Sequence, residues 1–194
     1  MKNNKTDHRS RYTQRVIKEA LLKLLADKPL NKIGVSELCF FAEVNRGTFY
    51  NHFYDVYDVY ESIENDFYDE IKAKLDHVKS YDLDRPFFKE IMLLIYKNAD
   101  LVRLIINNKN NSDILKRIIE FVRGKFIEER SQTVKGHTAV FWDRVFSYVT
   151  NGSIGIISDW IYSDFRESLD EISAIITELN ELIMNAYINS VKKS

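Results

Sequence analysis

The spacing of apolar residues predicts four helices in the N-terminal part of the chain. Over residues 11–26, apolar side chains recur every three or four positions, and charged side chains occupy the opposite face. Pro29 biases the residue before it away from helical geometry, so the first helix ends there. The same pattern predicts two short helices, at about 35–42 and 46–52, and a long helix at about 55–78.

Five more helices are predicted in the rest of the chain. Their approximate ranges are 86–98, 100–107, 113–129, 138–162 and 169–190. Polar segments are expected to form the loops between them, at 80–85, 107–112 and 131–136.

The last two predicted helices are the most apolar part of the chain. Most faces of 138–162 and 169–190 are apolar, and a helix of that kind must be covered on several sides. A second copy of the chain is the natural cover, so we expect a homodimer through these two helices. Gly152, Ser153 and Gly155 would let another helix approach closely. The alternative is a monomer in which one of these helices forms the centre of the core.

The composition agrees with long helices in a reducing compartment. The 194 residues include only six Gly and two Pro, too few for a sheet protein with many tight turns. The single cysteine, Cys39, forms no disulfide within the chain, which fits a reducing environment. The polar first residues contain no signal-peptide core, and no apolar stretch reaches membrane-spanning length. We therefore expect a cytoplasmic protein that does not associate with membranes.

The charge of the chain is distributed unevenly, although its net value is only −1. Residues 1–54 contain ten Lys and Arg and five Asp and Glu, whereas residues 55–194 contain 18 and 24. Such an asymmetry indicates a basic N-terminal module that meets a polyanion and an acidic body that does not. Chance clustering would give the same numbers, so charge alone leaves both interpretations open.

The first three helices form a predicted helix-turn-helix unit. Asn45 is a suitable N-cap for the third helix, because its side chain can accept a hydrogen bond from the backbone N–H of Gly47 or Thr48. Phe49 and Phe53 share one face and are expected to pack inward. The other faces offer a cation, a hydroxyl, a phenol and an amide for phosphates and base edges, on Arg46, Thr48, Tyr50 and Asn51. An ordinary amphipathic helix with a solvated face is the alternative at this point.

Two segments resemble the N-terminal domain of the TetR/AcrR family of transcriptional regulators. They are IGVSEL at 33–38 and AEVNRGTFYNHF at 42–53, in which Gly-Thr-Phe-Tyr-x-His-Phe follows the predicted N-cap. The resemblance implies an all-α fold with a helix-turn-helix DNA-binding domain at 9–54. The helix at 55–78 would join it to a ligand-binding and dimerisation domain at 79–194.

The resemblance also implies a function and a role for each residue of the predicted recognition helix. The function is sequence-specific transcription regulation, usually repression, by a homodimer on double-stranded operator DNA. The expected phosphate contacts are Asn45, Thr48, Tyr50 and His52. The expected contacts to base edges in the major groove are Arg46, Gly47 and Asn51. The implied effector is a small molecule or a protein of unknown identity.

Two positions depart from the family pattern in ways that bear on DNA affinity. Glu43 stands where the family usually has Gly, so a left-handed turn there would carry some strain. Val56 stands where the family often has Lys, and Asp55 and Asp58 add negative charge nearby. These residues favour an alternative function, a helical protein–protein interaction factor with weak or lost DNA binding.

The C-terminal part of the chain offers looser signals. The segment 149–157, followed by Trp160, looks like a C-terminal domain of many such regulators, which implies a dimer held by a four-helix bundle. Four aromatic residues of the predicted C-terminal helices are candidates for the wall of an effector pocket: Tyr96, Phe121, Trp142 and Phe146. The competing expectation for each of them is a place in the ordinary core.

No catalytic or metal-binding set is found in the sequence. The four histidines, at 8, 52, 77 and 137, lack a Glu three residues before them, and no Gly-x-Ser-x-Gly or Gly-rich phosphate loop occurs. Cys39 lies on the apolar face of a predicted helix, as a small core residue does. We therefore expect no enzyme activity, no metal site and no cofactor.

Overall fold

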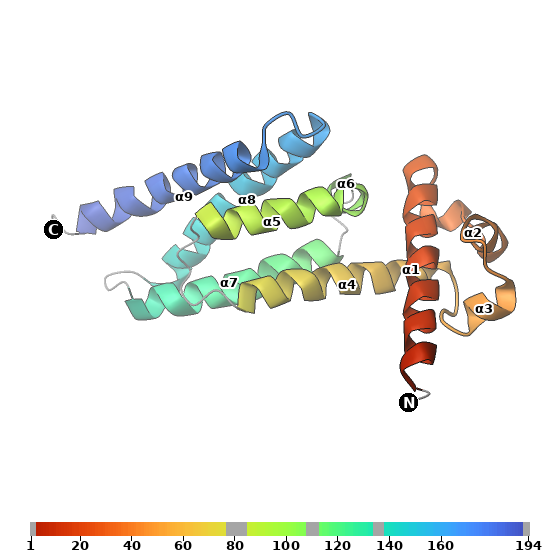
Figure 1. The fold of residues 1–194 in the computed structure, drawn as a ribbon. Helices are drawn as coiled ribbons and strands as arrows, with labels where there is room; N and C mark the ends of the chain where they lie inside the picture. Colours follow the sequence, from red (N-terminus) through yellow and green to blue (C-terminus); the bar gives the residue numbers. More distant parts are fainter. Residues whose placement is uncertain (1–2, 77–84, 108–112, 134–137, 192–194) are drawn as a thin grey trace. The chain divides into compact units, whose positions relative to one another are not determined.

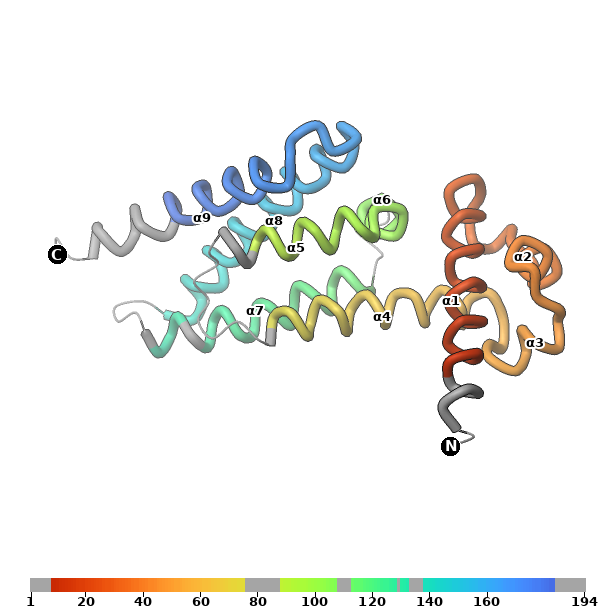
Figure 2. The backbone as a smooth tube through the Cα atoms, in the orientation of Figure 1, coloured from red at the N-terminus to blue at the C-terminus, as the bar shows by residue number. Residues whose placement is uncertain are grey.

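The structure is a computed structural model that describes residues 3–76, 85–107, 113–133 and 138–191. Every described element is a helix, as the periodicity predicts, and the chain divides into two compact units, Met1–Asp69 and Glu70–Ser194. Figure 1 shows the helices, and Figure 2 shows the course of the backbone. None of the helices in the described ranges combines the length and the apolarity that a membrane span needs.

The N-terminal unit is a small bundle built on one long helix. It contains α1 (Asn3–Asp27), the 3-10 turn η1 (Leu30–Lys32), α2 (Val35–Phe41), α3 (Arg46–Tyr50) and the first part of α4 (Val56–Asp76). Helix α1 packs against α2, and α2 against α3 (Figure 1). The residues that the apolar pattern places inward are fully buried, among them Ile17, Leu21, Leu38, Phe49 and Val59.

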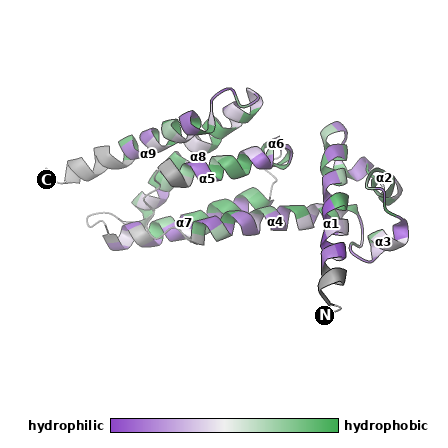
Figure 3. Cartoon of the chain, viewed as in Figure 1, coloured by the Kyte–Doolittle hydropathy of each residue, from purple (hydrophilic) through white to green (hydrophobic). Residues whose placement is uncertain are grey.

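The first helix is longer than its apolar pattern indicates. It begins at Asn3 rather than at about Arg11, because polar residues without a Gly or Pro extend a helix and leave no apolar periodicity. In Figure 3 the coloured part of α1 nearest its N-terminal end is mostly hydrophilic.

The C-terminal unit contains five helices and the end of α4 among its described residues. The five are α5 (Arg85–Lys97), α6 (Ala99–Asn107), α7 (Asp113–Thr133), α8 (Ala139–Tyr162) and α9 (Leu169–Val191). Helix α5 packs along α9, and α7 packs along α8. An ion pair between Lys89 and Asp170, 2.6 Å long, links α5 to the start of α9.

One predicted loop is partly wrong. Helix α7 continues to Thr133, whereas a loop was expected to start at residue 131. Ser131 and Gln132 are polar, but the segment has no helix breaker before Gly136, so the helix runs on. The predicted loops at 80–85 and 107–112 lie outside the described residues, apart from their helical end residues.

The turn between α8 and α9 is held by aromatic contacts. Asp164 and Phe165 have left-handed backbones, with φ of 56° and 59°. The Phe165 ring packs edge-on against Trp160 at 4.9 Å and Tyr96 at 4.8 Å between centroids. Arg103 of α6 pairs with the Asp164 carboxylate at 3.1 Å. These contacts stabilise two residues in a conformation that non-glycine residues rarely adopt.

Candidate nucleic-acid interface

Helix α3 is held at its start by the predicted N-cap. Asn45 has an extended backbone, with φ −80° and ψ 158°, and its Oδ1 accepts a hydrogen bond from the Thr48 N–H at 2.7 Å. The bond satisfies one of the N–H groups that a helix start leaves unpaired. Because Oδ1 is occupied, Asn45 retains only its Nδ2 hydrogens for a phosphate.

The two faces of α3 differ in the way the sequence predicts. Phe49 and Phe53 are buried, with ring centroids 6.0 Å apart. Of the seven predicted DNA-contacting residues, five are exposed: Asn45, Arg46, Gly47, Tyr50 and Asn51. The other two, Thr48 and His52, are half-buried. The seven therefore lie together on one short helix and its flanks, and five of them face solvent.

Gly47 is not required by packing within the protein. A Cβ added there would lie 3.4 Å from Asn45 Oδ1, an ordinary contact, and would be close to no other side chain among the described residues. Because Gly47 has no side chain, another molecule can closely approach the first turn of α3, where backbone N–H groups favour anions.

Arg46 is steadied by a residue not predicted from the sequence. Its Nη2 donates a hydrogen bond to Ser36 Oγ at the start of α2. The spacing of these residues across a turn does not reveal the contact, which depends on how α2 and α3 cross. The guanidinium is thereby held on the exposed side of the helix-turn-helix.

Cys39 behaves as a core residue. It is buried, and burial raises the pKa of its thiol, while the positive charge of Arg46 acts weakly in the opposite direction. A thiol kept protonated in this way is a poor nucleophile.

The turn between α2 and α3 carries the strain expected from its sequence. Glu43 has a left-handed backbone, with φ of 54°. Its N–H donates to the Phe40 carbonyl at 3.2 Å, and the Val44 N–H donates to the Cys39 carbonyl at 3.0 Å. The turn therefore has a left-handed residue at a position that usually needs glycine, although the residue there is Glu43.

The start of α4 is occupied by its own carboxylates. Asp55 Oδ1 accepts a hydrogen bond from the Asp58 N–H at 2.9 Å, and Asp58 Oδ2 accepts one from the Tyr54 N–H at 2.7 Å. The pattern is close to a capping box, except that Asp58 accepts from the residue before the N-cap and not from the N-cap itself. Val56 is only 6% exposed and belongs to the core. The position at which the family often has Lys is therefore apolar and buried, and two negative charges flank it.

Several cations of the N-terminal unit are already paired with carboxylates. Lys18 Nζ lies 2.6 Å from Asp66 Oδ2, and Arg15 lies 2.7 Å from Glu19. Lys28 pairs with Glu37. The positive charge that a polyanion meets is therefore smaller than the count of Lys and Arg in residues 1–54 indicates.

The four predicted pocket residues differ in their surroundings. Trp142 and Phe146 pack with Phe126 in a buried cluster between α7 and α8. Tyr96 is exposed, and its ring contacts Phe165 in the α8–α9 turn. Lys125 Nζ lies 4.6 Å from the centroid of the Phe121 ring. Among the described residues, no group of three His, Cys, Asp or Glu is placed to hold a metal ion.

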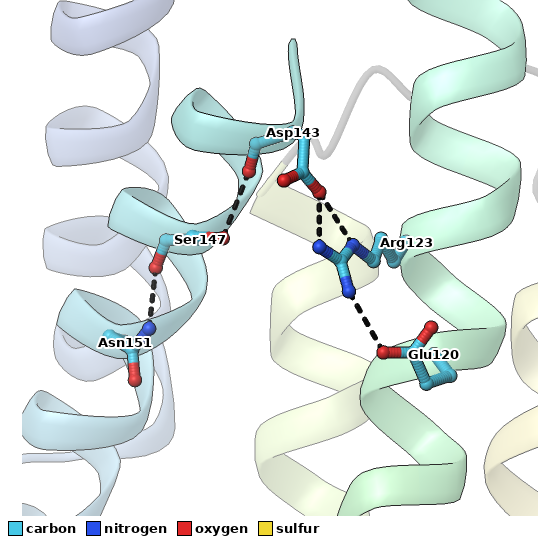
Figure 4. A network of polar contacts seen from close by, with 5 residues as sticks. All are labelled: Glu120, Arg123, Asp143, Ser147 and Asn151. Atoms are coloured by element: carbon cyan, nitrogen blue, oxygen red, sulfur yellow. Dashed lines mark hydrogen bonds and ion pairs between the residues drawn. The ribbon is translucent and has the colours of Figure 1, made fainter. Parts of the chain in front are cut away.

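Polar contacts fix α8 against α7. The Arg123 Nε donates to Asp143 Oδ1 at 2.6 Å, and its Nη1 donates to Glu120 Oε1 at 2.9 Å (Figure 4). Along α8, the Ser147 hydroxyl donates to the Asp143 carbonyl, and Asn151 Nδ2 donates to the Ser147 carbonyl at 2.7 Å. The ion pair sets which face of α8 is turned away from α7.

A groove of about 750 Å³ lies between α8 and α9, and none of the predicted pocket residues lines it. Its walls include Tyr148 and Gly152 of α8 and Leu179 of α9. Asn180, also in the wall, is only 7% exposed, and its Nδ2 has no hydrogen-bond partner in the described part of the chain. The sequence does not predict this unpaired amide, because a single Asn in an apolar helix gives no indication of its hydrogen-bond partners.

The C-terminal unit is similar in sequence to a known family. A TetR family model described as "Transcriptional regulator C-terminal region" matches residues 85–182. No curated protein matches the chain.

Solved structures of regulators have the same fold. The fatty acid degradation regulator FadR from Bacillus halodurans is 15% identical, over 87% of this chain and 94% of that one, with a TM-score of 0.61. A TetR transcriptional regulator from Streptococcus agalactiae is 15% identical, over 90% and 97%, with a TM-score of 0.56. The dihydroxyacetone kinase operon activator DhaS is 17% identical, over 87% and 93%, with a TM-score of 0.55.

Proposed function

The chain belongs to the TetR family of transcriptional regulators, and we propose that it is a homodimeric repressor that reads a specific operator through α3. An effector at the C-terminal unit would modulate that binding. Regulation of transcription is the function of the family. The contacting residues, the sign of regulation and the effector are what the proposal adds.

The outward face of α3 carries the DNA-binding proposal. Phe49 and Phe53 hold the helix from inside, and Arg46, Tyr50 and Asn51 are exposed. A guanidinium can bind guanine with two hydrogen bonds and an amide can bind adenine, while a phenol can donate to a phosphate. The contact between Arg46 and Ser36 supports this role, because a steadied side chain loses less freedom on binding.

A dimer through α8 and α9 would present two copies of α3. In that arrangement they enter successive major grooves about 34–36 Å apart on a pseudo-palindromic site. The exposure of large apolar residues on these helices supports the dimer. Tyr148 is 70% exposed and Leu182 is 67% exposed, as residues awaiting a partner are.

Selection from a random DNA library with the purified protein tests the proposal. One enriched palindrome is expected. Arg46→Ala should relax the base preference at one position of each half-site, and Tyr50→Ala should weaken binding to all sequences. Tyr50→Phe, which removes only the hydroxyl, separates the phosphate contact from the packing of the ring on Phe49, 5.4 Å away.

Arg166→Ala is the matched control for Arg46→Ala. Arg166 is an exposed arginine after α8, so the control changes net charge equally and should leave the enriched site unchanged. A relaxed base preference in both variants, or in neither, would contradict a role of α3 in recognition.

Two further experiments test whether the protein represses or activates transcription and whether it binds an effector. DhaS is named as an activator, so a reporter downstream of the enriched site decides between activation and repression. The chain has two Trp, and with Trp160→Phe the fluorescence comes from Trp142 alone. An effector that contacts Trp142 or Phe146 should change this signal and weaken operator binding in the same concentration range.

A protein–protein interaction factor with weak DNA binding is the second candidate function. The specific observation in its favour is the start of α4, where Val56 is buried and Asp55 and Asp58 cap the helix. A folded dimer that enriches no DNA sequence at low salt would favour this candidate.

A further inference from the structure

The exposed face of α8 carries a pattern that is symmetric about its middle. Six exposed residues, separated by three or four positions except for one adjacent pair in the middle, form one stripe: Arg144, Tyr148, Asn151, Gly152, Gly155 and Asp159. No charged residue occurs in the sequence between Arg144 and Asp159.

The symmetry lies in the spacing from the pair Asn151–Gly152. Tyr148 precedes Asn151 by three residues, and Gly155 follows Gly152 by three. Arg144 precedes Asn151 by seven residues, and Asp159 follows Gly152 by seven. About this centre the large Tyr148 corresponds to the small Gly155, and the cation Arg144 corresponds to the anion Asp159.

We propose that α8 packs antiparallel on α8 of a second copy, about a two-fold axis at Asn151–Gly152. In this register Tyr148 of each subunit lies over Gly155 of the other, and Arg144 pairs with Asp159 of the other. The proposal rests on the homodimer proposed above and adds its register and the residues that specify it. A parallel pairing would instead bring Arg144 against Arg144 and Asp159 against Asp159.

The protomer leaves the required space open. A Cβ placed at Gly152 or Gly155 meets no atom within 4 Å, so both glycines border open space on the described surface. Within the described ranges Arg144 and Asp159 form no ion pair of their own. The Arg123–Asp143 contact joins α8 to α7 (Figure 4), and no stripe residue takes part in it.

The groove beside the stripe is a second, independent observation. The buried Nδ2 of Asn180 has no acceptor among the described residues, and it borders the same groove as Tyr148 and Gly152. A buried donor without an acceptor is costly, so the groove is incomplete without a partner that brings an oxygen atom. A second copy that crosses at Gly152 would bring polar groups of its own stripe to this place.

A second copy fits the surface better than a small molecule does. The groove occupies only the middle of α8, whereas the stripe runs from Arg144 to Asp159. A ligand in the groove would leave both charges unpaired. A two-fold-related helix pairs both and covers the residues between them, as an isologous interface requires.

Charge exchange tests the register. Arg144→Glu and Asp159→Arg are each expected to raise the dimer dissociation constant about tenfold or more, because each places like charges together twice. Mixed in equal amounts, the two variants should form a heterodimer that restores the wild-type constant, since both pairs are then attractive. Sedimentation measures this against the protomer mass of 22.9 kDa.

A glycine substitution tests the contact between Tyr148 and Gly155. Gly155→Leu should abolish dimers at micromolar concentration and leave the helical content unchanged, because a Cβ at this position borders open space in the protomer. Gly124→Leu is the matched control. Gly124 is also an exposed helical glycine with open space at its Cβ, but it lies on α7, so its replacement should leave the dimer intact.

The outcomes separate this inference from the proposed function. A wild-type dimer that enriches an operator but is unaffected by the charge variants and by Gly155→Leu would overturn the register and leave the regulator proposal standing. Single charge variants that stay monomeric when mixed would also overturn it. A wild-type protein that is monomeric at all concentrations would overturn both.

Discussion

Helices α3 and α8 show how one all-helical chain makes two kinds of surface. The outward face of α3, a helix of five residues, carries a cation, a phenol and an amide. The outward face of α8, a helix of 24 residues, is uncharged over its central part and keeps its charges at the two ends of a stripe. The first surface suits a polyanion and the second suits a protein, although both sit on similar backbones.

Salt should separate the two surfaces most strongly. If the two heads make six to ten phosphate contacts, operator affinity should fall by about 10³-fold or more between about 50 and 200 mM salt. The dimer dissociation constant should change far less over that range, because the proposed contact contains only two ion pairs, whereas the operator contact neutralises many phosphates. Fluorescence anisotropy with labelled operator and sedimentation of the free protein measure the two constants. Equal salt sensitivity of both would break the comparison.

Loss of the inward face of α3 should unfold the N-terminal unit. Phe49→Ala removes a fully buried ring and is expected to cost about 3–5 kcal/mol of the free energy of unfolding. Phe40→Ala is the control, because Phe40 on α2 is largely exposed. Urea denaturation should show an early transition for Phe49→Ala alone, while the C-terminal unit still dimerises. A single transition at unchanged urea concentration would show that Phe49 does not hold this unit together.

Removal of the N-cap should weaken α3 without unfolding the unit. Asn45→Ala loses the bond to the Thr48 N–H and should cost about 1 kcal/mol of stability. The loss of operator affinity should exceed the loss of stability, because the substitution also removes the amide hydrogens that would face DNA. Asn45→Ser keeps the cap and should recover stability but not the full affinity. Recovery of both would indicate that Asn45 acts only as a cap.

The strained turns of the two units should respond differently to glycine. Glu43→Gly relieves a left-handed residue in an exposed turn and should raise stability by about 1 kcal/mol. Asp164→Gly should give no such gain, because it also removes the ion pair with Arg103. Thermal unfolding measures both, and Glu43→Ala, which does not relieve the strain, is the control. A gain for Asp164→Gly equal to that for Glu43→Gly would contradict this difference.

A further effect is a dependence of stability on alkaline pH. Burial, together with the charge of Glu64 and a hydrogen bond to it, raises the pKa of Tyr60 from 10.0 to about 12. The folded state then holds this proton more tightly than the unfolded chain, so the contribution is complete below pH 10 and is lost between about pH 10 and 12. Tyr60→Phe should flatten this part of the curve of stability against pH, and Tyr57→Phe, on the exposed side of α4, should not.

The N-terminal unit could be predicted closely because its signals are local. Asn45 is three residues from the N–H that it caps, and Phe49 and Phe53 are one helical turn apart. Periodicity and capping chemistry act over such distances. The contact of Arg46 with Ser36 was not predictable, because it depends on how two helices cross.

The C-terminal unit shows where sequence patterns stop. The helices were predicted, but Trp142 and Phe146 lie in a buried cluster, and the groove between α8 and α9 is lined by other residues. Apolar periodicity does not distinguish a core aromatic from a pocket aromatic. The isolation of Asn180 Nδ2 likewise follows from tertiary packing and not from its neighbours in sequence.

Directed cleavage of the enriched operator tests most directly whether α3 reads the DNA. Asn51→Cys places a reactive thiol at the exposed C-cap of α3, where a DNA-cleaving copper chelate can be attached, while Cys39 stays buried. Arg166→Cys, labelled in the same way, is the control. Cuts at two symmetric positions within the palindrome are expected from Asn51→Cys and none from Arg166→Cys. A labelled Asn51→Cys protein that still binds the operator but cuts nowhere inside it would contradict recognition by α3.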